Sequence, residues 1–272
     1  MRRAPATAKL NLALIVGPRR EDGRHEVATV LQRLDLADRI AVEPASKLRV
    51  RGFPDDTLVR RALESLAAAA NVEPLWEARI WKRIPVAAGL GGGSSDAATA
   101  LRLANVTLPE PFSDARLWEV AAELGADVPF FLASGPQLGE GVGVDLTPLD
   151  LPQDYWVLLL LPHSAAKAST ADVYADFDTR GGADGWEERR EELNRTLQEV
   201  QRPRDLAALP PNDLASSPLA EEFVDLGAFR ADITGAGPTV YGLFHHRSQV
   251  AAAERELRRH GRTWISVPTW YG

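Results

Sequence analysis

The sequence predicts an α+β protein of two domains, and three observations support this. The chain has 272 residues, 45% hydrophobic and 25% charged, which suits a soluble protein with one large domain or two modest ones. Its second half runs strand, helices, strand, strand, helix, strand, the order of an α+β sandwich. A proline-bounded stretch, residues 148–153, separates the halves. We therefore expect domains over residues 1–150 and 151–272.

The first half begins with an alternating run at residues 8–16, which predicts a strand. Two further stretches are expected to form a strand pair, residues 35–43 and 47–51. Three stretches are expected to be helices: residues 56–70, 94–104 and 115–124. Residues 76–84 alternate again and predict another strand, in which Lys82 is the one exception on an otherwise apolar face.

The second half begins with a continuous apolar run, residues 154–161, which predicts a strand buried on both faces. Helices are expected over residues 171–177, 186–201 and 248–259. Strands are expected over residues 230–234 and 239–244, flanking a glycine turn, and over residues 263–267. Residues 212–213, Asn-Asp after two prolines, are typical of a helix cap.

Residues 85–98, PVAAGLGGGSSDAA, carry the strongest functional signal. Four glycines within five residues lie between a predicted strand and a predicted helix, so backbone N–H groups can approach an anion closely. The helix start adds unpaired N–H groups and the positive end of its dipole. Ser94 and Ser95 add hydroxyls that can cap the helix or reach a phosphate-bound metal ion. The stretch predicts a phosphate-binding loop.

Two common phosphate-binding motifs do not fit this loop. A P-loop needs Lys directly after the last glycine, and a dinucleotide fingerprint started at Gly89 needs a third glycine there; Ser94 occupies that position. The alternative is a surface loop followed by a Ser-capped helix, and the density of glycines favours the phosphate site over it.

Composition excludes several other classes. A net charge of −7 without a basic stripe argues against a nucleic-acid partner. No apolar run approaches 18 residues, which argues against a membrane span, and the N-terminal residues lack the core of a signal peptide. The absence of cysteine excludes disulfides and thiolate chemistry. These features are typical of a cytoplasmic bacterial enzyme.

Three motifs together resemble a known kinase superfamily. The loop at residues 85–95, the AKLNL stretch at residues 8–12 and the ITGAGPTVY stretch at residues 233–241 are similar to those of the galactokinase, homoserine kinase, mevalonate kinase and phosphomevalonate kinase (GHMP) superfamily. RREDGRHE at residues 19–26 and GADVPFF at residues 125–131 resemble one family within it, the 4-diphosphocytidyl-2-C-methyl-D-erythritol kinases. The resemblance spans essentially the whole chain.

This resemblance implies a GHMP kinase fold, with an N-terminal ribosomal-protein-S5-like α/β domain, a C-terminal ferredoxin-like α+β domain and the active site in the cleft between them. It implies transfer of a phosphoryl group from ATP, with Mg²⁺, to the 2-hydroxyl of a cytidyl diphosphate substrate in the non-mevalonate isoprenoid pathway. Ser95 is the expected contact to Mg²⁺ through ATP. The expected ATP-binding residues are Pro85, Val86, Ala87, Ala88, Gly89, Leu90, Gly91, Gly92, Gly93, Ser94 and Ser95.

Lys9 and Asp127 are the catalytic residues that the resemblance implies. From local sequence alone, Lys9 fits a structural lysine at the end of a strand as well as a catalytic one. Asp127 by itself fits an aspartate between a helix and a turn better than a catalytic base. In the family pattern they lie side by side, where a lysine cation would favour the charged carboxylate and the reacting hydroxyl's loss of a proton. Asp127 either removes that proton or orients the hydroxyl, and both roles remain open.

The expected substrate-binding residues are Asn11, His25, Thr170, Tyr174 and Gly235. Asn11 shares a strand face with Lys9, and Tyr174 matches an aromatic side chain that stacks on cytosine in the family. The family pattern Asp-Gly-Tyr-His has Arg24 in place of the tyrosine here, so one aromatic wall of the cytosine pocket is replaced. A guanidinium plane can also stack on a base.

Two alternative functions remain at this point. One is a related kinase acting on homoserine, mevalonate or a sugar, and the other is a ligand sensor without catalysis. The presence of both Lys9 and Asp127 disfavours the sensor, which needs neither. The expected partners are ATP and the small-molecule substrate, with no nucleic acid or membrane, and the expected state is a monomer or weak homodimer.

Overall fold

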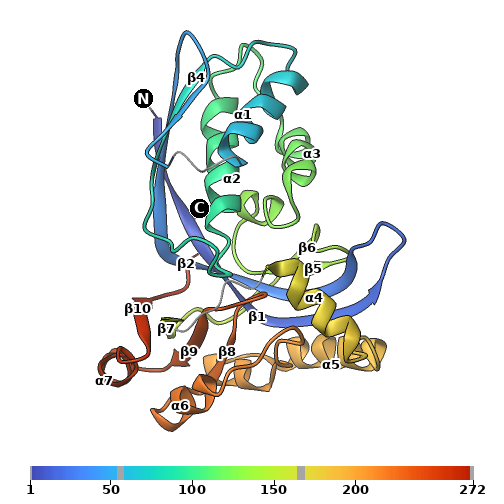
Figure 1. Ribbon diagram of the computed structural model, residues 1–272, viewed down its shortest axis with the longest axis vertical. Helices are drawn as coiled ribbons and strands as arrows, with labels where there is room; N and C mark the ends of the chain where they lie inside the picture. Colours follow the sequence, from blue (N-terminus) through green and yellow to red (C-terminus); the bar gives the residue numbers. More distant parts are fainter. Residues whose placement is uncertain (1, 54–57, 164–168, 270–272) are drawn as a thin grey trace.

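Two β-sheets with helices on their faces form the molecule, as the α+β prediction requires (Figure 1). The computed structural model describes residues 2–53, 58–163 and 169–269. The strands of the first sheet end at Pro148 and those of the second begin at Trp156. The expected division between residues 150 and 151 falls in that connection and stays a prediction.

The first sheet has six strands: β1 (Arg2–Arg19), β2 (His25–Pro44), β3 (Arg49–Arg51), β4 (Trp76–Trp81), β5 (Gln137–Glu140) and β6 (Asp145–Pro148). Their order is β3-β4-β2-β5-β6, with β1 also paired to β2. Helices α1 (Leu58–Ala69), α2 (Gly92–Asn105) and α3 (Asp114–Leu124) lie together on one side of it (Figure 1). The start expected for the first helix, residues 56–57, lies outside the described residues.

The expected pairing of residues 35–43 with 47–51 is wrong. Strand β4 pairs with β2 in antiparallel register, and β3 pairs in parallel with the far edge of β4. The β2–β4 register places buried Ile40 opposite buried Ile80. A three-residue strand offers much less apolar surface to β2, so β4 takes that edge.

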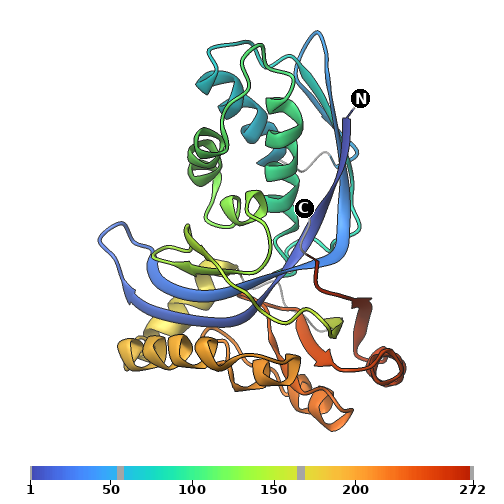
Figure 2. The same cartoon turned by 180° about the vertical axis from the view of Figure 1, so that it is seen from behind.

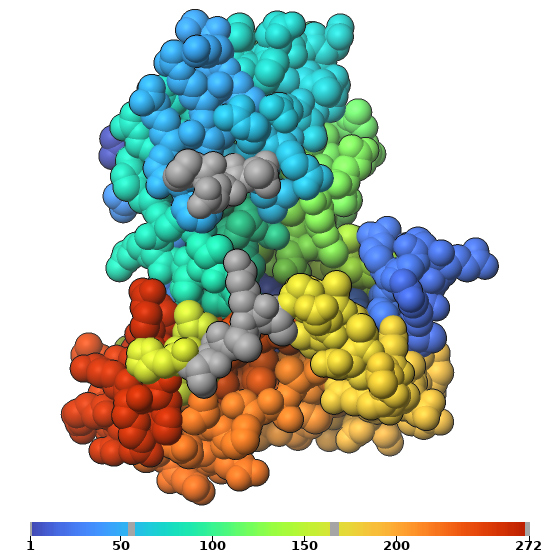
Figure 3. All heavy atoms as spheres, in the orientation of Figure 1, coloured from blue at the N-terminus to red at the C-terminus, as the bar shows by residue number. Residues whose placement is uncertain are grey.

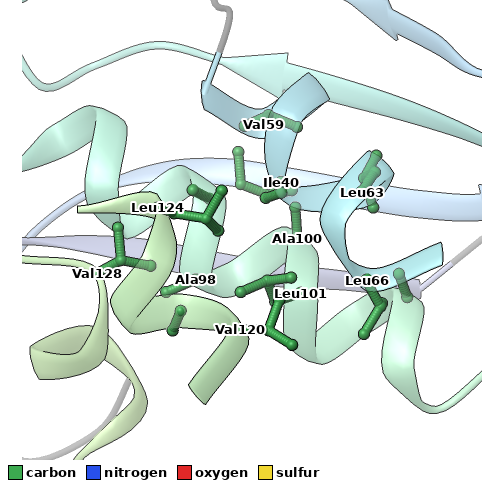
Figure 4. Close-up of a cluster of buried hydrophobic side chains, with 14 of the residues drawn as sticks. Ile40, Val59, Leu63, Leu66, Ala98, Ala100, Leu101, Val120, Leu124 and Val128 are labelled. Carbon is green, nitrogen blue, oxygen red and sulfur yellow. The ribbon is translucent and has the colours of Figure 1, made fainter. Parts of the chain in front are cut away.

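A hydrophobic core fills the space between the first sheet and its helices. Figure 4 shows Ile40 from the sheet, Leu63 from α1, Leu101 from α2 and Val120 from α3 converging there. All four side chains are buried. Burying each large aliphatic side chain contributes about 1.5–3 kcal/mol, so this cluster stabilises the helix that starts at the glycine loop.

The second sheet contains β7 (Trp156–Pro162), β8 (Arg230–Ile233), β9 (Val240–Phe244) and β10 (Gly261–Ser266) in the order β10-β7-β9-β8. Its pairs are all antiparallel. Its helices are α4 (Thr170–Thr179), α5 (Trp186–Glu199), α6 (Leu219–Asp225) and α7 (Arg247–Leu257). A strand order of fourth, first, third, second is that of a ferredoxin-like sheet, as predicted. Helix α6 and strands β5 and β6 were not predicted from the sequence.

Strands β1 and β2 join the two halves. Both belong to the first sheet and are far longer than expected. Their far portions extend past α5 and the second sheet (Figure 2). One core cluster accordingly contains Leu10 and Leu12 of β1 together with Leu193 of α5 and Tyr241 of β9. This shared core also includes Ala88 and Leu90, so it holds the glycine loop and β1 against β9. No helix among the described residues is long and apolar enough to span a membrane.

Candidate active site

Three adjoining cavities extend from the glycine loop to the junction between the two halves. The loop cavity, about 280 Å³, is lined by all ten residues from Pro85 to Ser94, with Phe53, Leu58 and Lys82. The central cavity, about 620 Å³, includes Lys9, Asn11, Asp127, Thr170, Tyr174 and Gly235 in its walls. The hairpin recess, about 540 Å³, lies between the β1–β2 turn and α4 and includes Arg24, His25, Tyr174 and Asp178. Figure 3 shows that turn, in blue, beside α4, in yellow.

Shared walls place the central cavity between the other two. It shares Gly89, Gly91 and Ser94 with the loop cavity. It shares Thr170 and Tyr174 with the hairpin recess. A ligand in the loop cavity and a ligand in the recess would therefore meet in the central cavity.

The glycine loop is held against β1 and against the second half. The Lys9 amide donates to the Leu90 carbonyl at 3.0 Å. Gly91 has φ = +68°, and a Cβ there would lie 2.9 Å from both Lys9 Cγ and Phe131 Cζ. Gly89 has φ = +77°, and its Cβ would lie 2.4 Å from the Thr234 carbonyl oxygen. Only glycine combines that backbone conformation with so close an approach.

Helix α2 begins at Gly92, with Gly91 at its N-cap and no side-chain capping bond. Ser94 and Ser95 therefore lie in the first turn, not at the cap, as a correction to the expected helix start. Ser94 lines both the loop and central cavities, whereas Ser95 is 1% exposed and lines neither. Of the two serines expected to bind ATP, Ser94 therefore lines the cavities, whereas Ser95, the expected contact to Mg²⁺, is buried beside them.

A largely buried cluster of charged side chains lies where the chain enters the glycine loop from β4. Lys82, just past β4, lies 2.5 Å from Asp38 Oδ2 and 2.7 Å from Asp96 Oδ2. Asp38 also accepts the Ile84 amide at 2.9 Å. Burial alone would lower the pKa of Lys82, but the two carboxylates outweigh it and raise that pKa. The cluster connects β2 and the end of β4 to α2 through Asp96. The lysine on an apolar strand face was its signal in the sequence.

Lys9 and Asn11 form a hydrogen-bonded chain on β1. Lys9 Nζ donates to Asn11 Oδ1 at 2.6 Å, and Asn11 Nδ2 donates to Thr29 Oγ1 at 2.8 Å. Lys9 Nζ also lies 3.8 Å from Asp127 Oδ2. Lys9 is buried, while the Asp127 side chain is 44% exposed and lines the central cavity. Two side chains that are 118 positions apart thus present a cation and a carboxylate to one space.

Tyr174 separates the central cavity from the hairpin recess. The His25 ring stacks on Tyr174 with centroids 4.9 Å apart and planes 30° apart. Burial, and secondarily the negative charge of Asp127, raise the pKa of Tyr174 to about 12, so its hydroxyl stays protonated at neutral pH. The Arg24 side chain is 62% exposed and lies 3.1 Å from Asp22, at the rim of the recess. His25, Tyr174 and Arg24 thus line one recess.

Two residues that position the site were missed or misassigned. Thr234 Oγ1 accepts a hydrogen bond from the backbone N–H of Asn11 at 3.0 Å, which links β1 to the β8–β9 turn. Asn212 was expected to be a helix cap, but α6 begins only at Leu219. Instead the side-chain Nδ2 of Asn212 donates to the carbonyls of Ile233 at 2.9 Å and Gly235 at 2.7 Å. Asn212 therefore holds the turn whose Gly235 lines the central cavity.

Comparisons with known proteins point in one direction. Residues 57–135 match the family of GHMP kinases N terminal domains, and residues 188–263 match GHMP kinases C terminal. A 4-diphosphocytidyl-2-C-methyl-D-erythritol kinase from Anaeromyxobacter sp. (strain Fw109-5) is 40% identical over 93% of this chain and 85% of its own. One from Geobacter metallireducens (strain ATCC 53774 / DSM 7210 / GS-15) is 36% identical over 98% and 95%.

A solved structure supports the same likeness. The crystal structure of a 4-(cytidine 5'-diphospho)-2C-methyl-D-erythritol kinase superimposes with a TM-score of 0.79 at 31% identity. The match covers 98% of this chain and 99% of that one. A crystal structure of mevalonate kinase, with a TM-score of 0.75 at 14% identity, shares the fold.

Proposed function

This chain belongs to the family of 4-diphosphocytidyl-2-C-methyl-D-erythritol kinases, within the GHMP kinases, and we propose which part of that family's reaction takes place in each of its three cavities. The family and the two-domain fold class predicted from the sequence are confirmed. The protein is an ATP-dependent kinase that phosphorylates the 2-hydroxyl of 4-diphosphocytidyl-2-C-methyl-D-erythritol in the non-mevalonate isoprenoid pathway.

The order of the cavities carries the proposal. ATP occupies the loop cavity, where the backbone of Pro85–Ser94 and the start of α2 face its phosphates. The cytidine part of the substrate occupies the hairpin recess, beside Tyr174 and His25. The γ-phosphate and the acceptor hydroxyl then meet in the central cavity, which shares walls with both.

Lys9 and Asp127 prepare the acceptor. The carboxylate of Asp127 accepts a hydrogen bond from the substrate hydroxyl. It takes the hydroxyl proton as the new O–P bond forms and the bond between the γ-phosphorus and ADP breaks, which releases ADP. Lys9, 3.8 Å from that carboxylate, keeps the local charge balanced and stabilises negative charge on the attacking oxygen. Asn11 holds the Lys9 ammonium in place at 2.6 Å. Gly235 and Thr170 complete the walls around the erythritol group.

Mg²⁺ fits the oxygen donors in this space. The Ser94 hydroxyl and the half-exposed Asp127 carboxylate both line the central cavity, and hard oxygen donors suit this ion. The described residues contain no cluster of three or more His, Cys, Asp or Glu side chains that could hold a metal, so ATP phosphates would supply the remaining ligands. When bound there, Mg²⁺ would neutralise negative charge on the phosphoryl group being transferred.

A substrate panel tests the function. Purified protein with ATP, Mg²⁺ and 4-diphosphocytidyl-2-C-methyl-D-erythritol should release ADP, measured as kcat/KM in a coupled assay. Homoserine and mevalonate serve as matched acceptor controls and should give little turnover. Turnover of a control acceptor, with none of the cytidyl substrate at millimolar concentration, would refute the assignment.

Two further expectations are proposed with this function. The chain acts as a monomer or weak homodimer, which light scattering at micromolar and higher concentrations checks. It also works in the bacterial cytoplasm, because its lack of cysteine and its charged composition suit that compartment. Fractionation of cells that express the protein tests this location.

A further inference from the structure

The hairpin recess contains a carboxylate for which the proposed reaction has no use. Asp178 lies on α4 one helical turn after Tyr174, and it is the only carboxylate among the described residues that line the recess. Its Oδ1 lies 2.7 Å from His25 Nε2. The side chain is still 41% exposed, so it is held in position but remains open to a ligand.

The chemistry of this pair makes the recess a hydrogen-bond acceptor. An ionised carboxylate can only accept, so His25 Nε2 must carry the proton that is shared with Asp178. In the neutral ring this leaves Nδ1 of His25 with a lone pair. The arginines of the same recess have partners within the turn: Arg24 pairs with Asp22, and Arg19 Nε donates to the Gly23 carbonyl.

The position of Asp178 on α4 also favours contact with a nucleobase. Residues four apart on a helix lie on the same face, so a ring stacked near Tyr174 has its edge toward Asp178. Cytosine and uracil differ at the 4 position of that edge, where cytosine carries an amino donor and uracil a carbonyl acceptor. A carboxylate binds the amino group and repels the carbonyl.

We infer that Asp178 is a specificity-determining residue that makes the recess select cytosine over uracil. The inference rests on the proposed function, because it requires the nucleobase to enter this recess. It adds to that function a reason why the substrate is a cytidyl and not a uridyl compound.

Binding of CDP and UDP to the full chain, measured by isothermal titration calorimetry, tests the inference. Hydrogen bonds to charged groups contribute enough to predict a wild-type preference for CDP of about 10- to 150-fold. Asp178→Asn keeps the size of the side chain, and its Oδ1 can still accept from His25 Nε2. Its amide now offers N–H groups to the ligand, so the preference should fall at least about 5-fold, with UDP affinity equal or higher.

Asp176→Asn is the matched control, because Asp176 is exposed on the same helix and lines none of the three cavities. It should keep the wild-type preference. An unchanged CDP-to-UDP ratio in Asp178→Asn would overturn the inference alone, as would an equal loss of both affinities, which indicates a packing contact. Absence of CDP binding by the wild type, together with no turnover of the cytidyl substrate, would overturn the proposed function as well.

Discussion

Replacing Lys9 with Met separates a catalytic cation from a structural lysine. Met keeps the aliphatic stem that packs against Gly91 and removes only the charge, which lies 3.8 Å from Asp127 Oδ2. At that distance two unit charges interact by about 4 kcal/mol with an effective dielectric constant of 20 and by about 1 kcal/mol in water. The half-exposed Asp127 places the pair between these limits.

The expected result is a fall in kcat of roughly 5- to 1,000-fold, because each 1.36 kcal/mol on the barrier changes the rate tenfold. Folding should hardly change, since Asn11 Oδ1 keeps a hydrogen bond from Thr234 Oγ1 at 3.2 Å. We expect Tm to stay within about 4 °C of the wild type.

Coupled ADP-release kinetics and thermal unfolding measure the two effects on the same preparation. Lys47→Met is the control, because Lys47 is exposed in the connection between β2 and β3 and should change neither quantity. A Lys9→Met variant with a much lower Tm but wild-type kcat per folded molecule would refute a catalytic Lys9 and support a packing role.

Four further variants test other parts of the site. Asp127→Asn should lower kcat by about 10²-fold or more with KM for ATP nearly unchanged, and a near-normal kcat would exclude Asp127 as base or charge partner. Gly91→Ala should weaken ATP binding measured by calorimetry, because its Cβ clashes in a left-handed backbone, so wild-type affinity would contradict the loop geometry. Tyr174→Ala should raise KM for the cytidyl substrate about 5- to 150-fold but not KM for ATP, and equal changes in both would indicate packing. Asn212→Ala should lower kcat by loosening the β8–β9 turn, whereas a loss of Tm with kcat intact would assign it stability alone.

Much of the architecture and most site candidates followed from the sequence alone. The glycine loop between strand and helix, α3 and the apolar strand β7 depend on neighbouring residues in the chain, so short patterns predict them. The motifs around Lys9 and Asp127 identified both residues, and the structure places their charged groups 3.8 Å apart.

Tertiary structure decided what local patterns cannot express. Three features each depend on contacts between distant segments: the pairing of β3 with β4 in place of β2, the hydrogen bonds of Asn212 to the β8–β9 turn, and the burial of Ser95 next to half-buried Ser94. In the sequence, Lys82 is likewise an exception on an apolar strand face, and only the fold brings Asp38 and Asp96 close enough to pair with it. Local preferences are set by a few neighbouring dihedral angles and side chains. The partner of a strand or of a buried charge is instead the best of many competing long-range contacts, and only the folded chain brings those contacts together.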